Sequence, residues 1–174
     1  MAATPENLAV IARGGKSDIP VGPMCHDTVL GWLEESGYVP DDAHATLFLT
    51  GEDEVQCRTD VYARIFVNQE DTHVIDVDTL KDLPAGTIIG FYKENLYMHT
   101  IIACGDQIFA GSNNGGIINP DEQFRINYND FMLMQTKQIK FNTDGTWGMD
   151  GYKMYAAAPD VIAQRVKDAL RVEP

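Results

Sequence analysis

Residues 83–114 read LPAGTIIGFYKENLYMHTIIACGDQIFAGSNN, a stretch that predicts three short β-strands in succession. After a Pro-Ala-Gly turn, the mostly apolar residues 87–93 predict the first strand. A polar Glu-Asn turn separates it from the second strand, which is expected at residues 96–103. The Gly105-Asp106 dipeptide is a tight hairpin signal before a third strand at residues 107–110. We therefore expect an antiparallel sheet built around this stretch.

Helical patterns stand on both sides of these strands. Residues 25–36 space their apolar side chains along one helical face, and Gly37 suits the C-terminal stop. Pro159 opens an amphipathic pattern that ends near residue 172. Further elements are expected as a helix at residues 5–12, strands at residues 47–49, 73–77 and 152–157, a helical turn at residues 128–134, and a hairpin of strands 138–142 and 146–149. The order of helix, strands and closing helix predicts an α+β fold.

Residues 55–67 allow two interpretations. The segment around residues 59–66 could be helical, but apolar side chains at every second position from Val61 to Val67 favour a strand. We therefore expect a strand here.

Length and charge limit the classes of protein and partner. At 174 residues the chain can bury one sizeable core, and we expect a single domain over residues 1–174. The 26 acidic residues outnumber the 13 basic ones, which gives a formal net charge of −13. Nucleic acids and anionic membrane surfaces attract clustered Lys and Arg, so we expect neither as a partner.

The start of the chain lacks a basic segment followed by a long apolar stretch, and no apolar run reaches membrane-spanning length. We expect cytoplasmic synthesis without a signal peptide, which leaves export by a signal-independent secretion system open. Cys25, Cys57 and Cys104 are odd in number and lack metal-ligand spacing, so neither a disulfide framework nor a zinc site is expected. We expect no metal or organic cofactor.

Cys25 and His99 are the candidate catalytic residues. Cys25 begins the predicted helix, where backbone N–H groups and the helix dipole favour a thiolate. His99 lies in the apolar middle strand, a costly place for an imidazole without a partner. If the two side chains meet, the thiolate can attack a carbonyl, a backbone N–H can hold the oxyanion, and the imidazolium can protonate the leaving amine. Asn113, just beyond the third strand, is the first candidate for orienting the imidazole, and Asn114 and Ser112 are the alternatives.

Structural roles remain open for the same residues. Cys25 also fits a buried apolar thiol and His99 a core histidine with a satisfied ring. Asn113 and Asn114 also fit turn formers beside two glycines. A Cys25 and a His99 that lie apart would indicate a protein without this chemistry.

The other three histidines are weaker candidates. His26 would point off the core face of its helix, so a place at the rim of a site or in contact with substrate fits it better than a metal-ligand role. His44 lies in a polar loop and is expected to be inert. His73 is an alternative base, although its short acidic surroundings are more typical of a solvated strand end.

The pairing of GPMCHDTVLGWL, residues 22–33, with the stretch at 83–114 resembles the papain-like cysteine hydrolases, especially the bacterial NlpC-type peptidases and CHAP amidases. In those families a cysteine opens a helix, and a histidine begins an apolar strand that is followed by a Gly-Asp or Gly-Asn turn. The resemblance implies a papain-like core in which the helix carrying Cys25 packs on an antiparallel sheet carrying His99. It implies Cys25 as nucleophile, His99 as general base and acid, and Asn113 or Asn114 as the third residue.

The resemblance further implies a cysteine-dependent amidohydrolase or peptidase that forms a thioester acyl-enzyme on a peptide, protein or peptidoglycan-peptide substrate. The compact layout is also similar to the small amidase effector toxins that bacteria inject, which would add an immunity or inhibitor protein as a partner. A deamidase or acyltransferase would use the same pair. A non-catalytic acidic binding or immunity-type protein would need no reactive thiol.

Overall fold

The structure is a computed structural model that describes residues 3–14, 25–48, 55–75, 77–111, 125–127 and 152–172. Its elements in chain order are α1 (Pro5–Gly14), α2 (Cys25–Glu35), α3 (Ala43–Leu47), α4 (Val55–Ile65), β1 (Thr72–Val74), α5 (Val77–Lys81), β2 (Ile88–Lys93), β3 (Leu96–Gly105), β4 (Ile108–Ala110), β5 (Arg125–Asn127), β6 (Tyr152–Ala157) and α7 (Pro159–Val172). The predicted α+β class is confirmed, as are the three strands of the central stretch.

The described strands form one six-stranded antiparallel sheet in the order β1-β6-β2-β3-β4-β5. β2 and β3 form its central hairpin, and β6 pairs with the other edge of β2. A β-bulge interrupts the hairpin, because Phe91 faces His99 whereas the next residue, Tyr92, faces Tyr97. The extra residue of β3 is Met98, and a bulge of this kind locally increases the strand twist.

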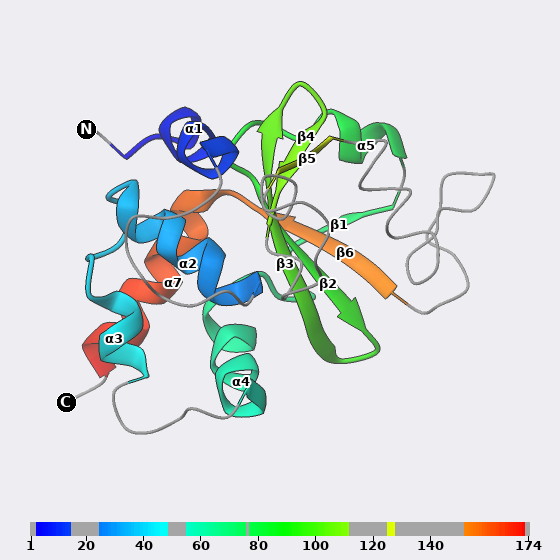
Figure 1. Ribbon diagram of the computed structural model, residues 1–174. Coiled ribbons are helices and arrows are strands. Elements are labelled where there is room, and N and C mark those ends of the chain that lie inside the picture. The colour runs from blue at the N-terminus through cyan, green and yellow to red at the C-terminus, as the bar shows by residue number, and fades with distance from the viewer. Residues whose placement is uncertain are drawn as a thin grey trace.

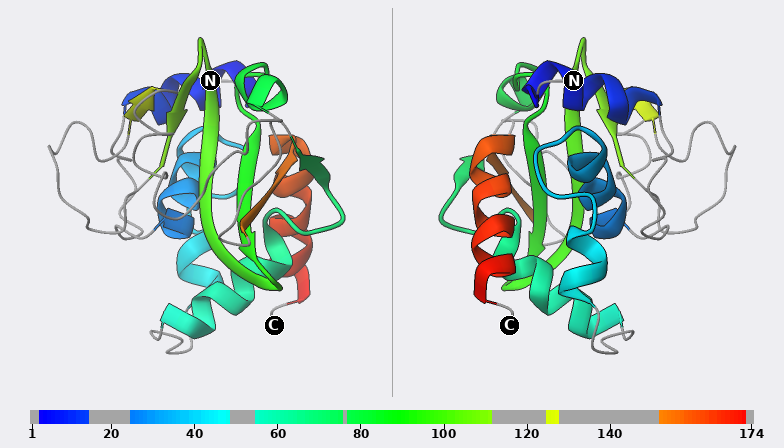
Figure 2. Two further views of the ribbon diagram at one scale, coloured as in Figure 1. Left: turned by 90° about the vertical axis from the view of Figure 1, so that its right-hand side faces the viewer. Right: turned by 90° about the vertical axis from the view of Figure 1, so that its left-hand side faces the viewer.

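Helices cover the two faces of the sheet unequally. α1, α2, α3, α4 and α7 lie on one side, here called the helix face, and α5 lies on the other side, here called the opposite face (Figures 1 and 2). Successive strand residues alternate between the two, as a period of two requires. Ile88 and Ile102 belong to the core on the helix face, and their neighbours Ile89 and Ile101 belong to the core on the opposite face.

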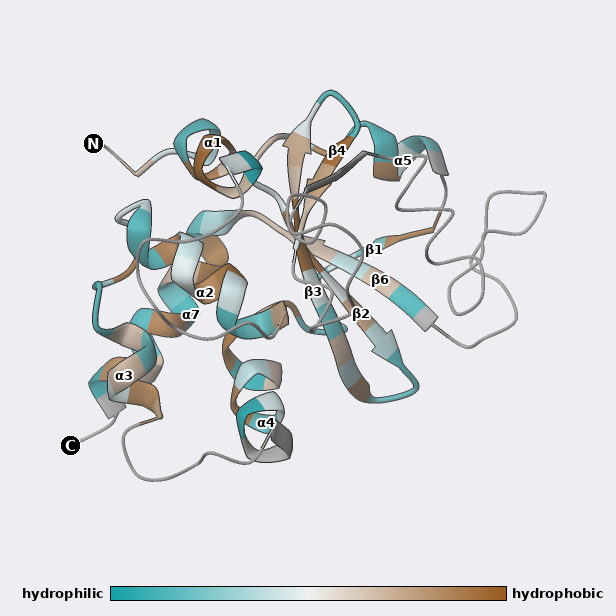
Figure 3. Cartoon of the chain, viewed as in Figure 1, coloured by the Kyte–Doolittle hydropathy of each residue, from teal (hydrophilic) through white to brown (hydrophobic). Residues whose placement is uncertain are grey.

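The helix face carries the larger core. Leu8 of α1, Trp32 of α2, Tyr62 of α4 and Val166 of α7 are among its fully buried members. Brown, apolar positions in Figure 3 gather on these helices and along the strands, and the turn between β2 and β3 is teal. Burying such side chains, at about 25 cal/mol per Å² of apolar surface, is the main force that holds the helices on the sheet.

α7 has a polar attachment as well as an apolar one. The guanidinium of Arg165 donates two hydrogen bonds of 2.8 Å to the carboxylate of Asp71 and a third, also 2.8 Å, to the carbonyl oxygen of Phe66. A bidentate pair of this kind has a defined geometry. It fixes the closing helix to the segment between α4 and β1.

Several sequence predictions of local structure are wrong. Residues 55–67 are largely helical, as α4, since Val61, Tyr62, Ile65 and Phe66 are buried at helical spacing against α7 and β3. Leu47, expected to begin a short strand, is the last residue of α3, and residue 49 lies outside the described residues. The strand expected at residues 73–77 is β1, which ends at Val74, and Val77 begins α5. β5 lies within a segment expected to be a loop, and the elements expected at residues 128–134, 138–142 and 146–149 lie outside the described residues. Among the described residues, no helix has the length and apolar composition needed to cross a bilayer.

The turn before β2 generates a stability prediction. Gly86 has φ +92°, and a Cβ there would lie 2.7 Å from backbone atoms of Pro5 in α1. Gly105 has φ +84°, but a Cβ there would meet only the Cβ of Ala85, at 3.6 Å. Both alanine variants should lose about 1–2 kcal/mol to the left-handed backbone, and Gly86→Ala should lose more because α1 must move. Urea unfolding of the two variants measures the difference, and equal losses would contradict the contact between Gly86 and α1.

Candidate functional site

Cys25 is the first residue of α2, as the sequence predicts. Its side chain is buried, with 3% of the residue exposed. α2 packs directly on β3, so the helix carrying Cys25 lies on the sheet carrying His99. Neither Cys25 nor Cys104 forms a disulfide. The thiol therefore stands at the positive end of a buried helix, where a thiolate would be favoured.

His99 lies on β3 opposite Phe91 of β2. The two ring centroids are 5.5 Å apart, and the imidazole is half-buried toward the opposite face of the sheet. Burial lowers the pKa of His99 from 6.5 to about 4. At neutral pH the ring is therefore uncharged, which is the form that can accept a proton.

A buried hydrogen bond joins the neighbours of these two residues. His26 Nδ1 lies 2.6 Å from Thr100 Oγ1, and these residues follow Cys25 and His99 directly in the chain. Electrostatics supports the same proximity. Burial first, and then the nearby His99, lower the pKa of His26 to about 3. The first turn of α2 and the first half of β3 therefore meet in one cluster.

The two sides of β3 differ along its length. Its residues 102–105 pair with β4, whereas among the described strands residues 96–101 pair with β2 alone. Thr100 faces α2, whereas its neighbour His99 faces Phe91 of the opposite core, so the His99 ring and the first turn of α2 lie on opposite faces of β3.

The prediction that His26 points away from the core is wrong. Only 6% of His26 is exposed, and its ring centroid lies 4.5 Å from that of Tyr97 and 5.2 Å from that of Tyr62. The periodicity of α2 predicts one buried face, but β3 and α4 pack against further sides of the same helix. A polar residue in the first turn is consequently enclosed.

The remaining sequence candidates have less favourable places. Ser112, Asn113 and Asn114 lie outside the described residues, so their predicted role stays a prediction. His73 is exposed on β1 and stacks on Tyr155 at 4.9 Å, which agrees with a strand-end residue. Burial raises the pKa of the Cys104 thiol to about 12, as expected of a structural cysteine. The side chain of Cys57 is outside the described part of the structure.

Asp27 is a buried polar centre that sequence analysis missed. Its side chain is 2% exposed and accepts hydrogen bonds from His44 Nε2 at 2.9 Å, Arg58 Nη1 at 3.1 Å and the Tyr62 hydroxyl at 2.7 Å. Burial alone would raise the pKa of Asp27, but the hydrogen bonds from His44 and Tyr62, with the Arg58 charge, hold it below its ordinary value. His44, expected to be inert, instead ties α3 to α2. His44, Arg58 and Tyr62 lie 17, 31 and 35 positions from Asp27 in the chain, so no local sequence pattern indicates this cluster.

Glu34, near the end of α2, is also enclosed, with 4% of the residue exposed. Its Oε1 accepts the backbone N–H of His44 at 3.1 Å. Burial raises the pKa of Glu34 to about 7, and the charges of Asp41 and Asp42 act in the same direction. The carboxyl therefore titrates near neutrality.

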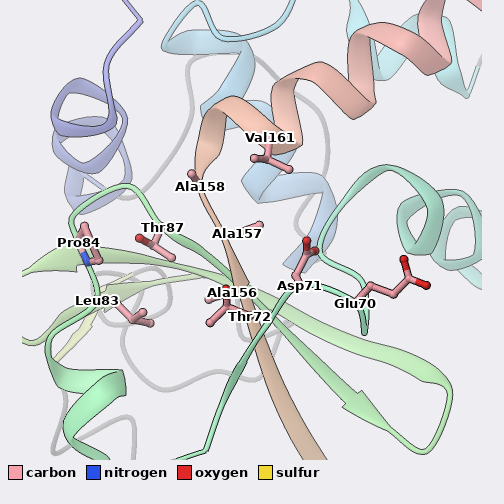
Figure 4. A pocket seen from close by; sticks show the side chains of 10 residues that line it. All are labelled: Glu70, Asp71, Thr72, Leu83, Pro84, Thr87, Ala156, Ala157, Ala158 and Val161. Atoms are coloured by element: carbon pink, nitrogen blue, oxygen red, sulfur yellow. The ribbon is translucent and has the colours of Figure 1, made fainter.

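A pocket of about 410 Å³ opens at another part of the sheet (Figure 4). Its described lining residues come from three segments: Glu70, Asp71, Thr72, Leu83, Pro84, Thr87, Ala156, Ala157, Ala158 and Val161. None of them carries a thiol or an imidazole, and the carboxylate of Asp71 is already bound by Arg165. Among the residues that the structure describes, no group of His, Cys, Asp and Glu has the arrangement of a metal site.

Comparisons with protein-family models, with curated proteins and with solved structures gave no match to this chain. The chemistry of the site therefore has to be argued from its own residues.

The Asp27 cluster generates a prediction about stability. Asp27→Asn should lower the free energy of unfolding by about 3 kcal/mol at pH 7, because it leaves Arg58 and His44 without their buried carboxylate. The folded-state pKa of Asp27 is lowered. The wild type should therefore have the larger free energy of unfolding above pH 4, and this difference should disappear as pH falls through the folded-state pKa. Urea unfolding at pH 3 and pH 7 measures it, with the exposed Asp42→Asn as control. A loss no larger than that of the control would contradict the role of Asp27.

Glu34 generates the opposite pH dependence. Its folded-state pKa is raised, so its contribution to stability is complete below about pH 4.5 and is lost as pH rises through about 7. Glu34→Gln keeps an acceptor for His44 N–H without a charge. We expect this variant to be more stable than wild type at pH 8, by on the order of 1 kcal/mol, and to lose the advantage near pH 4.5.

Thermal unfolding against pH measures this difference. Glu35→Gln makes the same change in net charge at the next, half-buried position of α2 and serves as the matched control. The assignment fails if Glu34→Gln and Glu35→Gln give the same curve.

Proposed function

We propose that this protein is a cysteine-dependent amidohydrolase or peptidase with a papain-like core. Cys25 is the nucleophile and His99 the general base and acid. The observation that supports the proposal is the packing of α2, which begins at Cys25, against β3, which carries His99. The 2.6 Å hydrogen bond between His26 and Thr100 belongs to this contact. Two chain segments 74 positions apart are thus in contact, with Thr100 facing α2 and His99 on the other face of β3.

The local environment of Cys25 suits the role of nucleophile. Cys25 begins an eleven-residue helix, so its thiolate would lie at the positive end of the helix dipole. Burial lowers the pKa of His99 to about 4, so its imidazole is uncharged at neutral pH.

The reaction follows from these groups. The thiol of Cys25 gives its proton to His99, and its sulfur attacks the amide carbon, while the backbone N–H of Cys25 stabilises the oxyanion. The C–N bond breaks as His99 returns the proton to the departing amine, which leaves a thioester. Water then attacks the thioester with His99 as base, and the acid and the free thiol are regenerated. Asn113 or Asn114 would orient the imidazole.

The proposal is tested by the rate at which iodoacetamide alkylates each cysteine between pH 4.5 and 9, resolved by peptide mass spectrometry. We expect Cys25 to react with a midpoint well below the value of about 8.5 for an ordinary thiol, and His99→Ala to abolish that reactivity. Cys104, buried and with a raised pKa, is the internal control and should stay unmodified. His73→Ala removes an exposed imidazole on β1 and should leave the Cys25 profile unchanged.

Two results decide against the enzyme. One is a Cys25 that is as inert as Cys104, and the other is a Cys25 profile that is the same with and without His99. Either would favour the acidic binding protein that the composition also allows. If the low-pH reactivity is present, peptidoglycan peptides and protein glutamines are the first substrates to assay. Release of ammonia identifies a deamidase, and a new amino terminus identifies a peptidase.

A further inference from the structure

The hydrogen bond of His26 continues into β3 as a buried relay. The hydroxyl of Thr100 donates to the hydroxyl of Tyr97 at 2.5 Å. A threonine hydroxyl has one proton, so in this arrangement Thr100 Oγ1 can only accept from His26. When the Thr100 proton is directed to Tyr97, His26 donates from Nδ1–H to Thr100, and this arrangement leaves Nε2 unprotonated.

The receiving end of this relay is held rigidly. Thr100 is fully buried, and the Tyr97 ring stacks on Tyr92 with centroids 4.9 Å apart and planes 4° from parallel. The Tyr92 hydroxyl donates to the carbonyl oxygen of Val67 at 2.6 Å, which links the stacked pair to the segment after α4. This part of the sheet has few alternative positions. A residue that donates a hydrogen bond to Thr100 is consequently held in place against it.

We propose that His26 is a positioning residue whose Nδ1–H, bound to Thr100, clamps the first turn of α2 to β3 and so fixes the position of Cys25 relative to the strand that carries His99. The inference rests on the proposed function of that pair. His26 touches neither substrate nor reacting atoms in this role. It acts through the backbone, because it follows Cys25 and its partner follows His99.

Asp27 restrains the same helix in a different direction. It connects α2 to α3 and α4 through His44, Arg58 and Tyr62, whereas His26 connects α2 to the sheet. A helix tied to its neighbouring helices can still shift relative to β3. Misplacement of reacting groups by about 1 Å can reduce a rate about 10²-fold, so the His26 clamp has a kinetic consequence beyond stability.

Thr100→Val is the sharpest variant, because it removes the hydroxyl and nearly preserves shape. We expect the alkylation rate of Cys25 at pH 6 to fall about 10²-fold and its pH profile to approach that of an ordinary thiol. Thr100→Ser restores a hydroxyl and should restore the profile. Thr28→Val is the matched control, because Thr28 is buried in the same turn of α2 and its Oγ1 has no hydrogen-bond partner in the described part of the chain.

Substitution of His26, the donor of this hydrogen bond, gives a comparison that is independent of the Thr100 variants. His26→Asn retains an amide N–H close to the position of Nδ1 and should keep most of the low-pH reactivity, whereas His26→Phe retains a ring without a donor and should lose it. Far-UV circular dichroism and thermal unfolding establish that the variants fold. A purely structural role for His26 would lower thermal stability in His26→Phe and leave the pH profile of Cys25 in place.

The outcomes separate this inference from the proposed function. Low-pH reactivity that depends on His99 but survives in Thr100→Val and His26→Phe overturns the clamp and leaves the enzyme intact. Wild-type Cys25 without such reactivity overturns both. Should the variants fail to fold, long-range ¹H–¹⁵N spectra of the wild type still decide. They should show His26 with a protonated Nδ1 and a bare Nε2, and an Nε2–H form or an imidazolium would overturn the clamp.

Discussion

Enclosure of α2 is the constraint on which the rest of the structure depends. All of its residues except the last are buried, including His26, Asp27, Thr28 and Glu34. Buried polar groups cost free energy unless they are hydrogen-bonded. The helix therefore depends on neighbouring elements for partners to His26, Asp27 and Glu34. β3 supplies Thr100, and α3 and α4 supply the groups around Asp27.

These polar contacts give the packing a direction that apolar burial lacks. Hydrophobic burial is non-directional and would tolerate some sliding of α2 along the sheet. The contacts of His26 with β3 and of Asp27 with the helices restrain the first turn from two sides. Cys25, the residue immediately before them, is thus held more closely than a thiol in an apolar core would be. Placement of the candidate nucleophile and enclosure of the helix are two results of the same contacts.

The electrostatic properties of the site follow from burial more than from net charge. The chain carries a formal charge of −13, yet both His26 and His99 have pKa values lowered by burial, to about 3 and about 4. A general excess of carboxylates would stabilise imidazolium and raise these values. Loss of hydration at the junction of α2 and β3 outweighs it. The result is two neutral imidazoles near this junction, with His26 on the helix face of β3 and His99 on the opposite face.

Local sequence signals determined the elements that carry the site: the start of α2 at Cys25, the three strands around His99, and α7 with its amphipathic spacing. They succeeded because turns, helix starts and side-chain periodicity depend on residues a few positions apart. They failed for α4, where alternating apolar residues suggested a strand and contact with α7 and β3 selected a helix. Only the tertiary structure decided the burial of His26 and the convergence of His44, Arg58 and Tyr62 on Asp27. Each of those partners lies 17 to 74 positions from the residue it binds, and no short-range pattern encodes such a distance.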